Sequence, residues 1–467
     1  MNDHTIDKDQ ANKGQARCPG EPSTQDIIAR DRVGAPDWVR SESYEFLGDA
    51  DVSKSRYIDA EYAKREYQNL WSKTWQFACR EEHIPEVGDY YVYDIGRSSF
   101  IITRVSDTQI KAYYNACLHR GTKLRPSGTD GSASVFRCPF HGWTWGIDGS
   151  CKEIVCDWDF PHVNKAKNSL PEARVELLGG FVFINMDNNA PTLAEYLGPE
   201  VMAQMAQWKL EDRYITAHVS KVIPANWKLT MEAFMEAYHV LETHPQVAVS
   251  NADANSQYDV YGEHVNRFIS PLGVLSPHLK GRYTEQDVLN QFTVGDATVL
   301  GDADRTLKEG ETARQRMADM MREMFSKATD ADLSGTSDSE LLDCFSYTVF
   351  PNTFLFPGIS LPMVYRFRPV ADDHRKCLYE VFFMHPVPAN GERPEPACDE
   401  RLEEHQSFCE AEAMNDGFGA ILDQDTENLR LQQEGLEASV KCGITLGSYQ
   451  EIRIRHFELA VDKYMKG

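Results

Sequence analysis

The feature that most constrains this chain is a pair of short clusters in which a cysteine and a histidine lie close together. Cys117 and His119 form the first cluster, and Cys138 and His141 form the second after a gap of eighteen residues. Two thiolates and two imidazoles suit a [2Fe–2S] cluster in which the cysteines bind one iron and the histidines bind the other. We therefore expect two loops of the chain to hold an iron–sulfur cluster.

A structural zinc site is the alternative interpretation of these four residues. Zinc fingers also use two cysteines and two histidines, but they usually pair cysteine with cysteine and leave about two to four residues between paired ligands. Here each cluster mixes the two ligand types, and a single residue separates Cys117 from His119. The spacing favours iron and sulfur in the arrangement known as Rieske ligation.

Glycines and short apolar segments flank the two clusters. Gly121 and Gly142 lie where each loop has to bend sharply and bring backbone N–H groups close to the cluster sulfurs. Residues 89–93, 100–103 and 110–115 alternate apolar and polar side chains, which predicts short strands. The pattern therefore predicts two metal-binding loops on a small antiparallel sheet.

A second group of metal-binding side chains lies in a helical pattern of apolar residues that ends at Pro245. Glu232, Glu236 and His239 fall at i, i+4 and i+7, so one face of the expected helix carries two carboxylates and an imidazole. His244 lies about 140° from His239 around an ideal helix. The two histidines can share a metal only if the last turn is distorted or the helix has already ended. Alone, they could also be structural histidines near a helix end.

A mononuclear iron bound by these histidines would need a carboxylate ligand from elsewhere in the chain. Because a [2Fe–2S] cluster delivers one electron at a time, an iron held by two histidines and one carboxylate is a natural acceptor. The candidates are Asp423, Asp425 and Glu427. Asp425 shares a helical face with Leu429 and Leu436, which favours it. All three carboxylates could instead belong to a solvated helix start.

With these motifs, residues 44–465 resemble the oxygenase component, or α subunit, of the Rieske non-haem iron ring-hydroxylating oxygenases. The resemblance implies that Cys117, His119, Cys138 and His141 bind one [2Fe–2S] cluster per subunit. It also implies one mononuclear non-haem Fe(II) per subunit.

The resemblance assigns the ligands of the mononuclear iron as well. His239 and His244 match the family pattern acidic-x-x-His-x-x-x-x-His, and Asp425 is followed after seven residues by Gln-x-Gly-Leu. These three residues are therefore expected to bind the iron. Glu236 occupies the position of the acidic residue that connects the two metal sites in the family, and we expect a catalytic role for it.

Two positions depart from the family pattern. Glu236 stands where most ring dioxygenases have aspartate, and a similar glutamate is familiar from carnitine-type and betaine-type oxygenases. Ala233 stands where the family often has asparagine, so a polar group near the iron is missing.

The expected activity follows from the resemblance. It implies a terminal oxygenase that uses O2 and electrons from a separate reductase to hydroxylate or dihydroxylate a hydrophobic, aromatic substrate. A monooxygenase or demethylase acting on a quaternary ammonium substrate is the alternative, and a Rieske electron carrier without oxygenase activity is a third. Phe354, Phe356, Leu361 and Met363 could form an apolar wall for an aromatic molecule, or a cage for an ammonium group.

The resemblance also implies partners. The chain has no Gly-rich dinucleotide fingerprint, so NAD(P)H is expected to act only through a partner reductase, with or without a ferredoxin. Family α subunits form head-to-tail trimers, so we expect a homotrimer (α3) or an α3β3 assembly in which the cluster of one subunit serves the iron of its neighbour.

Charge and composition limit the other partners and the compartment. The formal net charge of −24 argues against nucleic acid or an anionic membrane surface as a partner. No apolar run approaches the length that spans a membrane, and residues 1–35 lack the apolar core of a signal peptide. Two of the eleven cysteines are the expected cluster ligands, and the other nine are widely scattered, which is typical of reduced thiols, so we expect a cytoplasmic protein.

These observations predict an α+β protein of 467 residues with two folded parts. Residues 1–43 are expected to be a mobile polar tail, 44–188 an N-terminal helix and a small antiparallel β Rieske domain, and 189–467 an α+β catalytic domain with an antiparallel sheet. Catalytic strands are predicted at 214–222, 345–350, 353–356, 363–369 and 378–386, with helices at 59–75 and 449–464.

Overall fold

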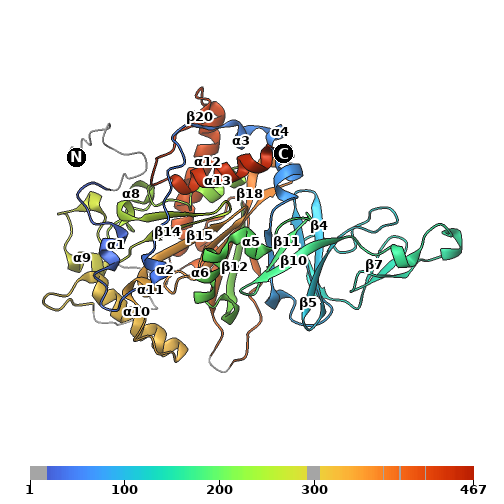
Figure 1. Ribbon diagram of the computed structural model, residues 1–467, viewed down its shortest axis with the longest axis horizontal. Coiled ribbons are helices and arrows are strands. Elements are labelled where there is room, and N and C mark those ends of the chain that lie inside the picture. The colour runs from blue at the N-terminus through green and yellow to red at the C-terminus, as the bar shows by residue number, and fades with distance from the viewer. Residues whose placement is uncertain (1–17, 292–304, 372, 389–390, 416, 467) are drawn as a thin grey trace.

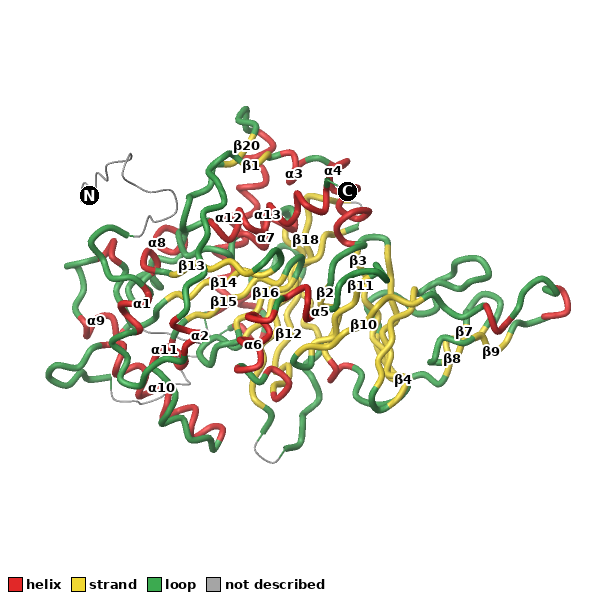
Figure 2. The backbone as a smooth tube through the Cα atoms, viewed as in Figure 1, coloured by secondary structure: helices red, strands yellow, loops and turns green. Residues whose placement is uncertain are grey.

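Two large sheets organise the molecule, one in each predicted part of the chain (Figure 1, Figure 2). The structure is a computed structural model that describes residues 18–291, 305–371, 373–388, 391–415 and 417–466. All paired strands of the described chain run antiparallel except β12 and β19. The expected α+β class is confirmed.

The first sheet has seven strands in the order β2-β11-β10-β5-β4-β3-β6. Its strands, in chain order, are β2 Gln76–Arg80, β3 Asp89–Ile95, β4 Ser98–Ser106, β5 Gln109–Tyr114, β6 Asp130–Ser132, β10 Glu172–Leu178 and β11 Phe181–Asn185. A separate three-stranded sheet consists of β7 Val135–Arg137, β8 Thr144–Gly146 and β9 Cys151–Glu153. It lies in a lobe that projects from the rest of the molecule, at the right of Figure 1.

The second sheet has eight strands in the order β13-β14-β15-β16-β17-β18-β12-β19. These are β12 Arg213–Ile223, β13 Gln257–Tyr261, β14 Val265–Ser270, β15 Cys344–Val349, β16 Thr353–Phe356, β17 Met363–Val370, β18 Asp373–Pro386 and β19 Asp399–Leu402. All five predicted catalytic strands are therefore present. Most side chains in the central strands are buried, which explains their long apolar runs.

Three helices that carry or flank site residues pack on the eight-stranded sheet. They are α7 Trp227–Glu232, α12 Phe418–Ala438 and α13 Ile452–Met465. Helix α7 contacts β17 and β18, α12 contacts β12, and α13 contacts β13 and β14. The predicted C-terminal helix at 449–464 is α13, displaced by a few residues.

The other helices are shorter or lie at the periphery. Downstream of residue 50 they are α3 Ser55–Ile58, α4 Ala60–Glu66, α5 Leu193–Leu197, α6 Pro199–Gln207, α8 Val240–Thr243, α9 Glu285–Asn290, α10 Ala313–Thr329 and α11 Asp338–Leu342. Helices α9, α10 and α11 share a small core of their own that includes Met317 and Leu341. No helix in the described ranges has the length and apolar character needed to cross a membrane.

The N-terminal segment differs from the mobile tail that we expected. Residues 1–17 lie outside the described part of the chain, but residues 18–43 form α1 Thr24–Ile28 and α2 Asp37–Arg40 and pack on the catalytic domain. Thr24 Oγ1 donates to the carbonyl of Asn255 at 2.7 Å. The buried Arg267 donates to the carbonyls of Trp38 and Ser41. The polar composition concealed this packing because charged side chains of the segment, such as Asp31 and Arg32, form ion pairs with Arg314 and Asp319.

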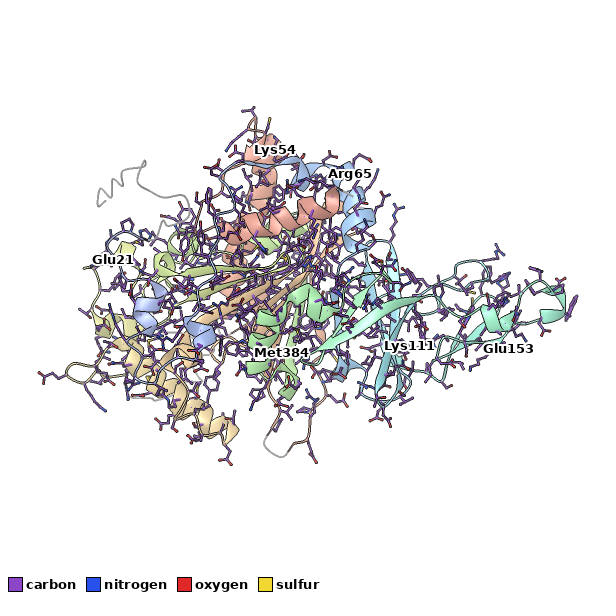
Figure 3. The ribbon with its side chains drawn as sticks, in the orientation of Figure 1. Glu21, Lys54, Arg65, Lys111, Glu153 and Met384 are labelled. Atoms are coloured by element: carbon purple, nitrogen blue, oxygen red, sulfur yellow. The ribbon has the colours of Figure 1, made fainter. Side chains whose placement is uncertain are left out.

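Residues 44–71 were expected to belong to the Rieske domain, but they pack on the other domain. β1 Val52–Ser53 pairs with β20 Gly443–Ile444 from the end of the catalytic domain. Lys54, labelled in Figure 3, donates to the carbonyl of Leu436 at 3.2 Å. The predicted helix at 59–75 is α4, continued by a π-helical turn at Tyr67–Trp71. This segment therefore belongs structurally with the catalytic domain, and the sheet of the Rieske domain begins at β2.

A buried group of charges joins the two domains. Arg366 on β17 forms an ion pair with Glu380 on β18 at 2.6 Å and also donates to the carbonyl of Ala78 on β2. Arg368 pairs with the same carboxylate at 3.0 Å and donates to the carbonyl of Asp94 on β3 at 2.8 Å. Although burial alone would raise the pKa of Glu380, the two guanidinium groups hold it well below its usual range.

We expect Arg366→Met to lower the free energy of unfolding by about 3 kcal/mol. The substitution removes one partner of a buried ion pair and leaves the Glu380 carboxylate with less compensation. Urea unfolding, followed by circular dichroism, measures the effect.

Arg375→Gln is the matched control. The Arg375 side chain is 54% exposed and pairs with Glu437 at 2.7 Å on the surface, so its loss should change stability by less than about 1 kcal/mol. If Arg366→Met and Arg375→Gln unfold at the same urea concentration, a structural role for the Arg366 pair is contradicted.

Candidate metal centres and substrate cavity

The two cysteine–histidine loops have the same backbone hydrogen bonds. In each loop the cysteine N–H donates to the carbonyl five residues later, and the glycine four residues after the cysteine donates back to the cysteine carbonyl, at 2.8 to 3.1 Å. Gly121 and Gly142 have φ angles of 81° and 74°, which L side chains rarely adopt. The repeated turn places Cys117 and Cys138 in equivalent positions, as predicted for both glycines.

The four predicted cluster ligands lie together in the projecting lobe. Cys117 and Cys138 are buried. The rings of His119 and His141 are 4.7 Å apart between centroids, and His119 stacks on Trp143 at 5.0 Å. The Nδ1 atom of His119 is buried and has no hydrogen-bond partner in the described chain. A buried imidazole nitrogen without a partner fits a metal ligand.

The surroundings of the thiols also fit an iron–sulfur cluster. Burial raises the pKa of the Cys138 thiol, but the backbone N–H groups of Phe140 and His141 stabilise its thiolate and bring the pKa below its usual value. Burial raises the pKa of the Cys117 thiol, which shares a hydrogen bond with Cys138. N–H groups directed at sulfur are the contacts that tune such clusters.

The chain around the second predicted metal site is not one continuous helix. Helix α7 ends at Glu232 and α8 begins at Val240. Two tertiary hydrogen bonds replace helical ones between them: Ala237 N–H donates to Tyr258 Oη at 3.0 Å, and Arg453 donates to the carbonyl of Met235 at 3.2 Å. The helix has thus already ended at the histidines, which was one of the two conditions for a shared metal.

The break separates two carboxylates that we expected on one helical face, so that prediction was wrong. Glu232 accepts a hydrogen bond from Tyr57 Oη at 3.0 Å, inside the protein. Glu236 instead turns toward His239 and accepts from its backbone N–H at 3.0 Å.

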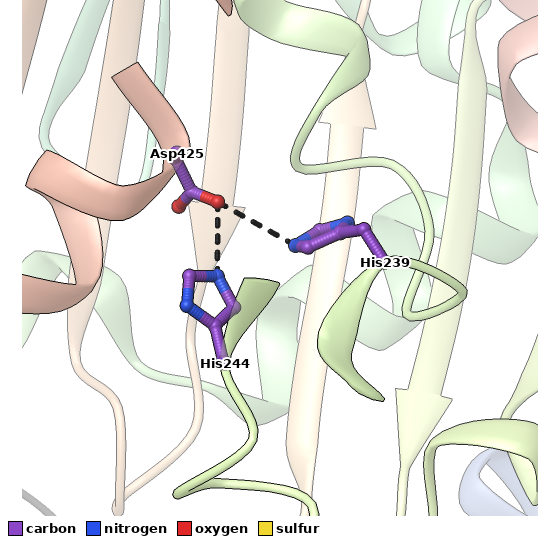
Figure 4. A group of neighbouring side chains, drawn as sticks. All are labelled: His239, His244 and Asp425. Atoms are coloured by element: carbon purple, nitrogen blue, oxygen red, sulfur yellow. Dashed lines mark hydrogen bonds and ion pairs between the residues drawn. The ribbon is translucent and has the colours of Figure 1, made fainter. Parts of the chain in front are cut away.

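The structure brings His239, His244 and Asp425 together (Figure 4). One Asp425 carboxylate oxygen lies 2.9 Å from His244 Nε2 and 3.5 Å from His239 Nε2. One ligand atom from each residue lies within 4.8 Å of the others. Two imidazoles and one carboxylate in this arrangement match the facial triad of non-haem iron oxygenases.

The outer nitrogen of each histidine is held by a second residue. His239 Nδ1 lies 2.6 Å from Glu236 Oε1, and His244 Nδ1 lies 2.8 Å from Gln424 Oε1. Each acceptor places the ring proton on Nδ1, which leaves Nε2 available to a metal. Sequence analysis missed Gln424, and its position beside Asp425 is the only signal that could have indicated it.

The site is electrostatically suited to a cation. Burial alone would lower the pKa of His239, but the carboxylates of Glu236 and Asp425 raise it to about 9. The two carboxylates therefore favour positive charge at this point, and a divalent cation would replace the proton.

The other two acidic candidates do not reach the site. Asp423 accepts hydrogen bonds from the hydroxyl of Ser407 and, at 2.9 Å, from the backbone N–H of Phe408. Glu427 is exposed on α12. Of the three carboxylates, Asp425 alone lies with the histidines.

A cavity of about 190 Å³ adjoins the triad and is mainly apolar. Phe356, Leu361 and Met363 line it as expected, whereas Phe354 packs on Phe234 in the core. Among the described residues, no Arg or Lys lines this cavity. Its further apolar lining comes from Ala233, Phe234, Ala237, Val240, Val247, Phe268, Leu272, Cys344, Tyr365, Phe418, Ile421 and Leu422.

Comparisons with known proteins agree with both parts of the fold. Residues 74–162 match the Rieske [2Fe-2S] domain, and residues 199–467 match the ring hydroxylating alpha subunit (catalytic domain). One solved structure with the same fold is a quaternary ammonium Rieske monooxygenase, with a TM-score of 0.63, 20% identity and coverage of 89% of this chain and 95% of that chain. Naphthalene 1,2-dioxygenase from Rhodococcus sp. gives a TM-score of 0.60 and 21% identity, over 89% of this chain and 94% of that chain.

Two kinds of curated relative are similar in sequence. The carnitine monooxygenase oxygenase subunit of Acinetobacter pittii is 31% identical over 44% of this chain and 57% of its own length. The large oxygenase component of the naphthalene 1,2-dioxygenase system of Pseudomonas putida is 34% identical over 40% of this chain and 42% of its own length. The chain thus matches about half the length of these relatives. With the catalytic-domain match extending over more than half of its residues, the chain belongs to the family of ring-hydroxylating α subunits and carries a Rieske [2Fe–2S] domain before its catalytic domain.

Proposed function

We propose that this protein is the terminal oxygenase of a multicomponent Rieske non-haem iron oxygenase that hydroxylates or dihydroxylates a hydrophobic, aromatic substrate. One observation carries the proposal: His239, His244 and Asp425 converge at the wall of an apolar cavity. A structural metal site would not need an adjoining cavity, and an electron carrier would not need a second metal site.

Each predicted ligand has a defined part in this proposal. Cys117, His119, Cys138 and His141 would bind the cluster. His239, His244 and Asp425 would bind the iron. When bound, the cluster supplies single electrons and the iron activates dioxygen.

The protein's own contribution at the iron site is to fix the ligands. Glu236 and Gln424 each hold the Nδ1 proton of one histidine, so that both Nε2 atoms face Asp425. The apolar cavity wall excludes water from the place where the substrate reacts.

The cavity favours an apolar substrate over a quaternary ammonium one. A carnitine-like molecule carries a carboxylate, and the described lining offers no Arg or Lys to bind it. A quaternary ammonium substrate remains the second candidate because Glu236 has the longer acidic side chain familiar from carnitine-type enzymes. Aromatic rings that line the cavity, such as Phe356 and Tyr365, could also contact a cation.

The projecting cluster lobe supports an assembly in which subunits exchange electrons. The lobe lies at the opposite end of the molecule from α8, which joins the two triad histidines (Figure 1). Phe140 and Trp158 on the lobe are 60% and 78% exposed, and Tyr238 beside His239 is 60% exposed. Exposed aromatic groups of this kind suit protein contacts. We propose a homotrimer (α3), with or without β subunits, in which Glu236 contacts His141 of the partner subunit.

The electron source and compartment complete the proposal. A separate NAD(P)H-dependent reductase, with or without a ferredoxin, would reduce the cluster. The described chain forms no disulfide among its eleven cysteines, which suits the reducing cytoplasm.

Product analysis tests the proposed activity. The holoenzyme is incubated with a surrogate reductase, NADH, O2 and a panel of arenes, aryl carboxylates, steroids and methylammonium compounds. We expect hydroxylated or dihydroxylated products from apolar ring compounds and none from carnitine or γ-butyrobetaine. Turnover of the ammonium compounds alone would support the second candidate.

Metal analysis tests the ligand assignment. The holoenzyme should contain about three iron atoms per chain, two in the cluster and one mononuclear. Asp425→Ala should lose one of the three, because the remaining two histidines do not complete the site. Glu427→Ala, on an exposed position of the same helix, should retain all three. Full iron in Asp425→Ala would contradict the assignment.

Glu236→Gln tests the route of the electron. The substitution keeps the size of the side chain but removes the charge that holds the Nδ1 proton of His239. Both metal sites should stay loaded, while reoxidation of the reduced cluster by substrate and O2 should slow about 100-fold. Single-turnover kinetics measures this rate. Reoxidation at the rate of the unmodified enzyme would show another route, and loss of the mononuclear iron would make Glu236 a ligand.

A further inference from the structure

The apolar cavity beside the triad has one uncharged polar region. Ser250, Asn251, Ser270 and Gln291 line it, on the segment after α8, at the end of β14 and after α9. The three residues other than Gln291 are buried, with exposed fractions of 1% to 8%. Buried polar groups are usually hydrogen-bonded within the protein, so each of these needs a partner.

A chain of hydroxyl groups fixes the orientation of the Asn251 amide. Ser256 Oγ donates to Ser270 Oγ at 2.8 Å, and Ser270 Oγ donates to Asn251 Oδ1 at 2.8 Å. The amide oxygen is therefore occupied. The amide NH2 group has no acceptor within the described chain, although Asn251 is only 8% exposed.

The Ser250 hydroxyl adds a second free donor beside this amide. The side chain is 5% exposed, and no hydrogen bond joins its hydroxyl to another described residue. Neither the Asn251 Nδ2 atom nor the Ser250 Oγ atom is enclosed by protein, so both donors are accessible from the cavity that these residues line. Two adjacent donors at the surface of a cavity therefore point to an acceptor supplied by a ligand.

The charge around the cavity defines that acceptor. The two carboxylates in the lining, Glu236 and Asp425, belong to the proposed metal site, where a divalent cation would balance them, and no described Arg or Lys lines the cavity. A carboxylate or phosphate would lose its hydration without gaining an Arg or Lys partner. A neutral oxygen suits both donors.

From these contacts we infer that the substrate is an aromatic ring compound bearing an uncharged hydrogen-bond acceptor, such as a carbonyl oxygen, and that Asn251 is the residue that selects it. The inference rests on the proposed function, because it concerns the ligand of the same cavity. Sites built to hydrogen-bond a substrate group discriminate strongly against analogues that lack it, since the site's own groups are then left unpaired.

Matched pairs of compounds test the inference. Isothermal titration calorimetry on the holoenzyme compares indane with 1-indanone and fluorene with 9-fluorenone, so each pair differs by one carbonyl group. We expect the ketone of at least one pair to bind about 10-fold or more tightly than its hydrocarbon. Equal affinities within both pairs, or binding of none of the four compounds, would overturn the inference.

Three variants test the assignment to Asn251. In Asn251→Leu the ratio of ketone affinity to hydrocarbon affinity should fall to about 1. The hydrocarbon itself should bind as tightly as before or more tightly. Asn251→Asp keeps the size and the contact with Ser270 but removes the donor, so the ratio should fall in that variant even if the leucine variant does not fold. Val247→Ala removes apolar contact only and should weaken both members of a pair alike. An unchanged ratio in Asn251→Asp would overturn the role of Asn251.

Oxygenation followed in the same preparations separates this inference from the proposed function. If the hydrocarbon and the ketone bind with equal affinity and both yield hydroxylated products, the inference is overturned and the proposed oxygenase function stands. No oxygenated product from any compound, with all metal sites loaded, would overturn the proposed function and with it the inference.

Discussion

The approach of two imidazole Nε2 atoms to one carboxylate oxygen of Asp425 is the constraint on which the rest of the catalytic domain depends. Asp425 comes from α12, whereas His239 and His244 flank the single turn of α8. Three polar groups this close are stable together only with a proton or a metal ion between them. The surrounding elements must therefore hold both segments in place, because hydration of these polar groups would favour their separation.

Buried ionic contacts behind the site provide much of that support. Lys228 on α7 forms an ion pair with Glu66 on α4, and both side chains are almost inaccessible. Glu232, at the end of α7, lies beside Glu458 on α13 and shares the Tyr57 hydroxyl with it. Burial and the neighbouring Glu458 raise the pKa of Glu232 well above its usual range. These contacts tie α4, α7 and α13 together, and removing one partner would leave an uncompensated buried group.

The sequence allowed the convergence of His239, His244 and Asp425 to be predicted, and it allowed the central strands to be predicted. Strand Thr353–Phe356 was predicted with its observed bounds, and the helical stripe containing Asp425 selected the carboxylate that lies with the histidines. The break after α7 could not be predicted, because tertiary hydrogen bonds from Arg453 and to Tyr258 create it. Gln424 was missed for the same reason, because its contact with His244 joins two segments that lie far apart in the chain.

Two cavities of different polarity adjoin the triad, and under the proposed function this difference fits a separation of electron entry from substrate binding. One is the apolar cavity of about 190 Å³ described above. The second has a volume of about 270 Å³ and a polar lining that includes Thr243, Asn428, Gln432 and Glu451. His239, Asp425 and Glu236 line both cavities. Under the proposed function, a polar cavity would accommodate a charged partner at low cost, whereas the apolar cavity would exclude water from the substrate. Glu236 lines both cavities and binds the outer nitrogen of His239, so in the proposed assembly it would connect the incoming electron to the iron site.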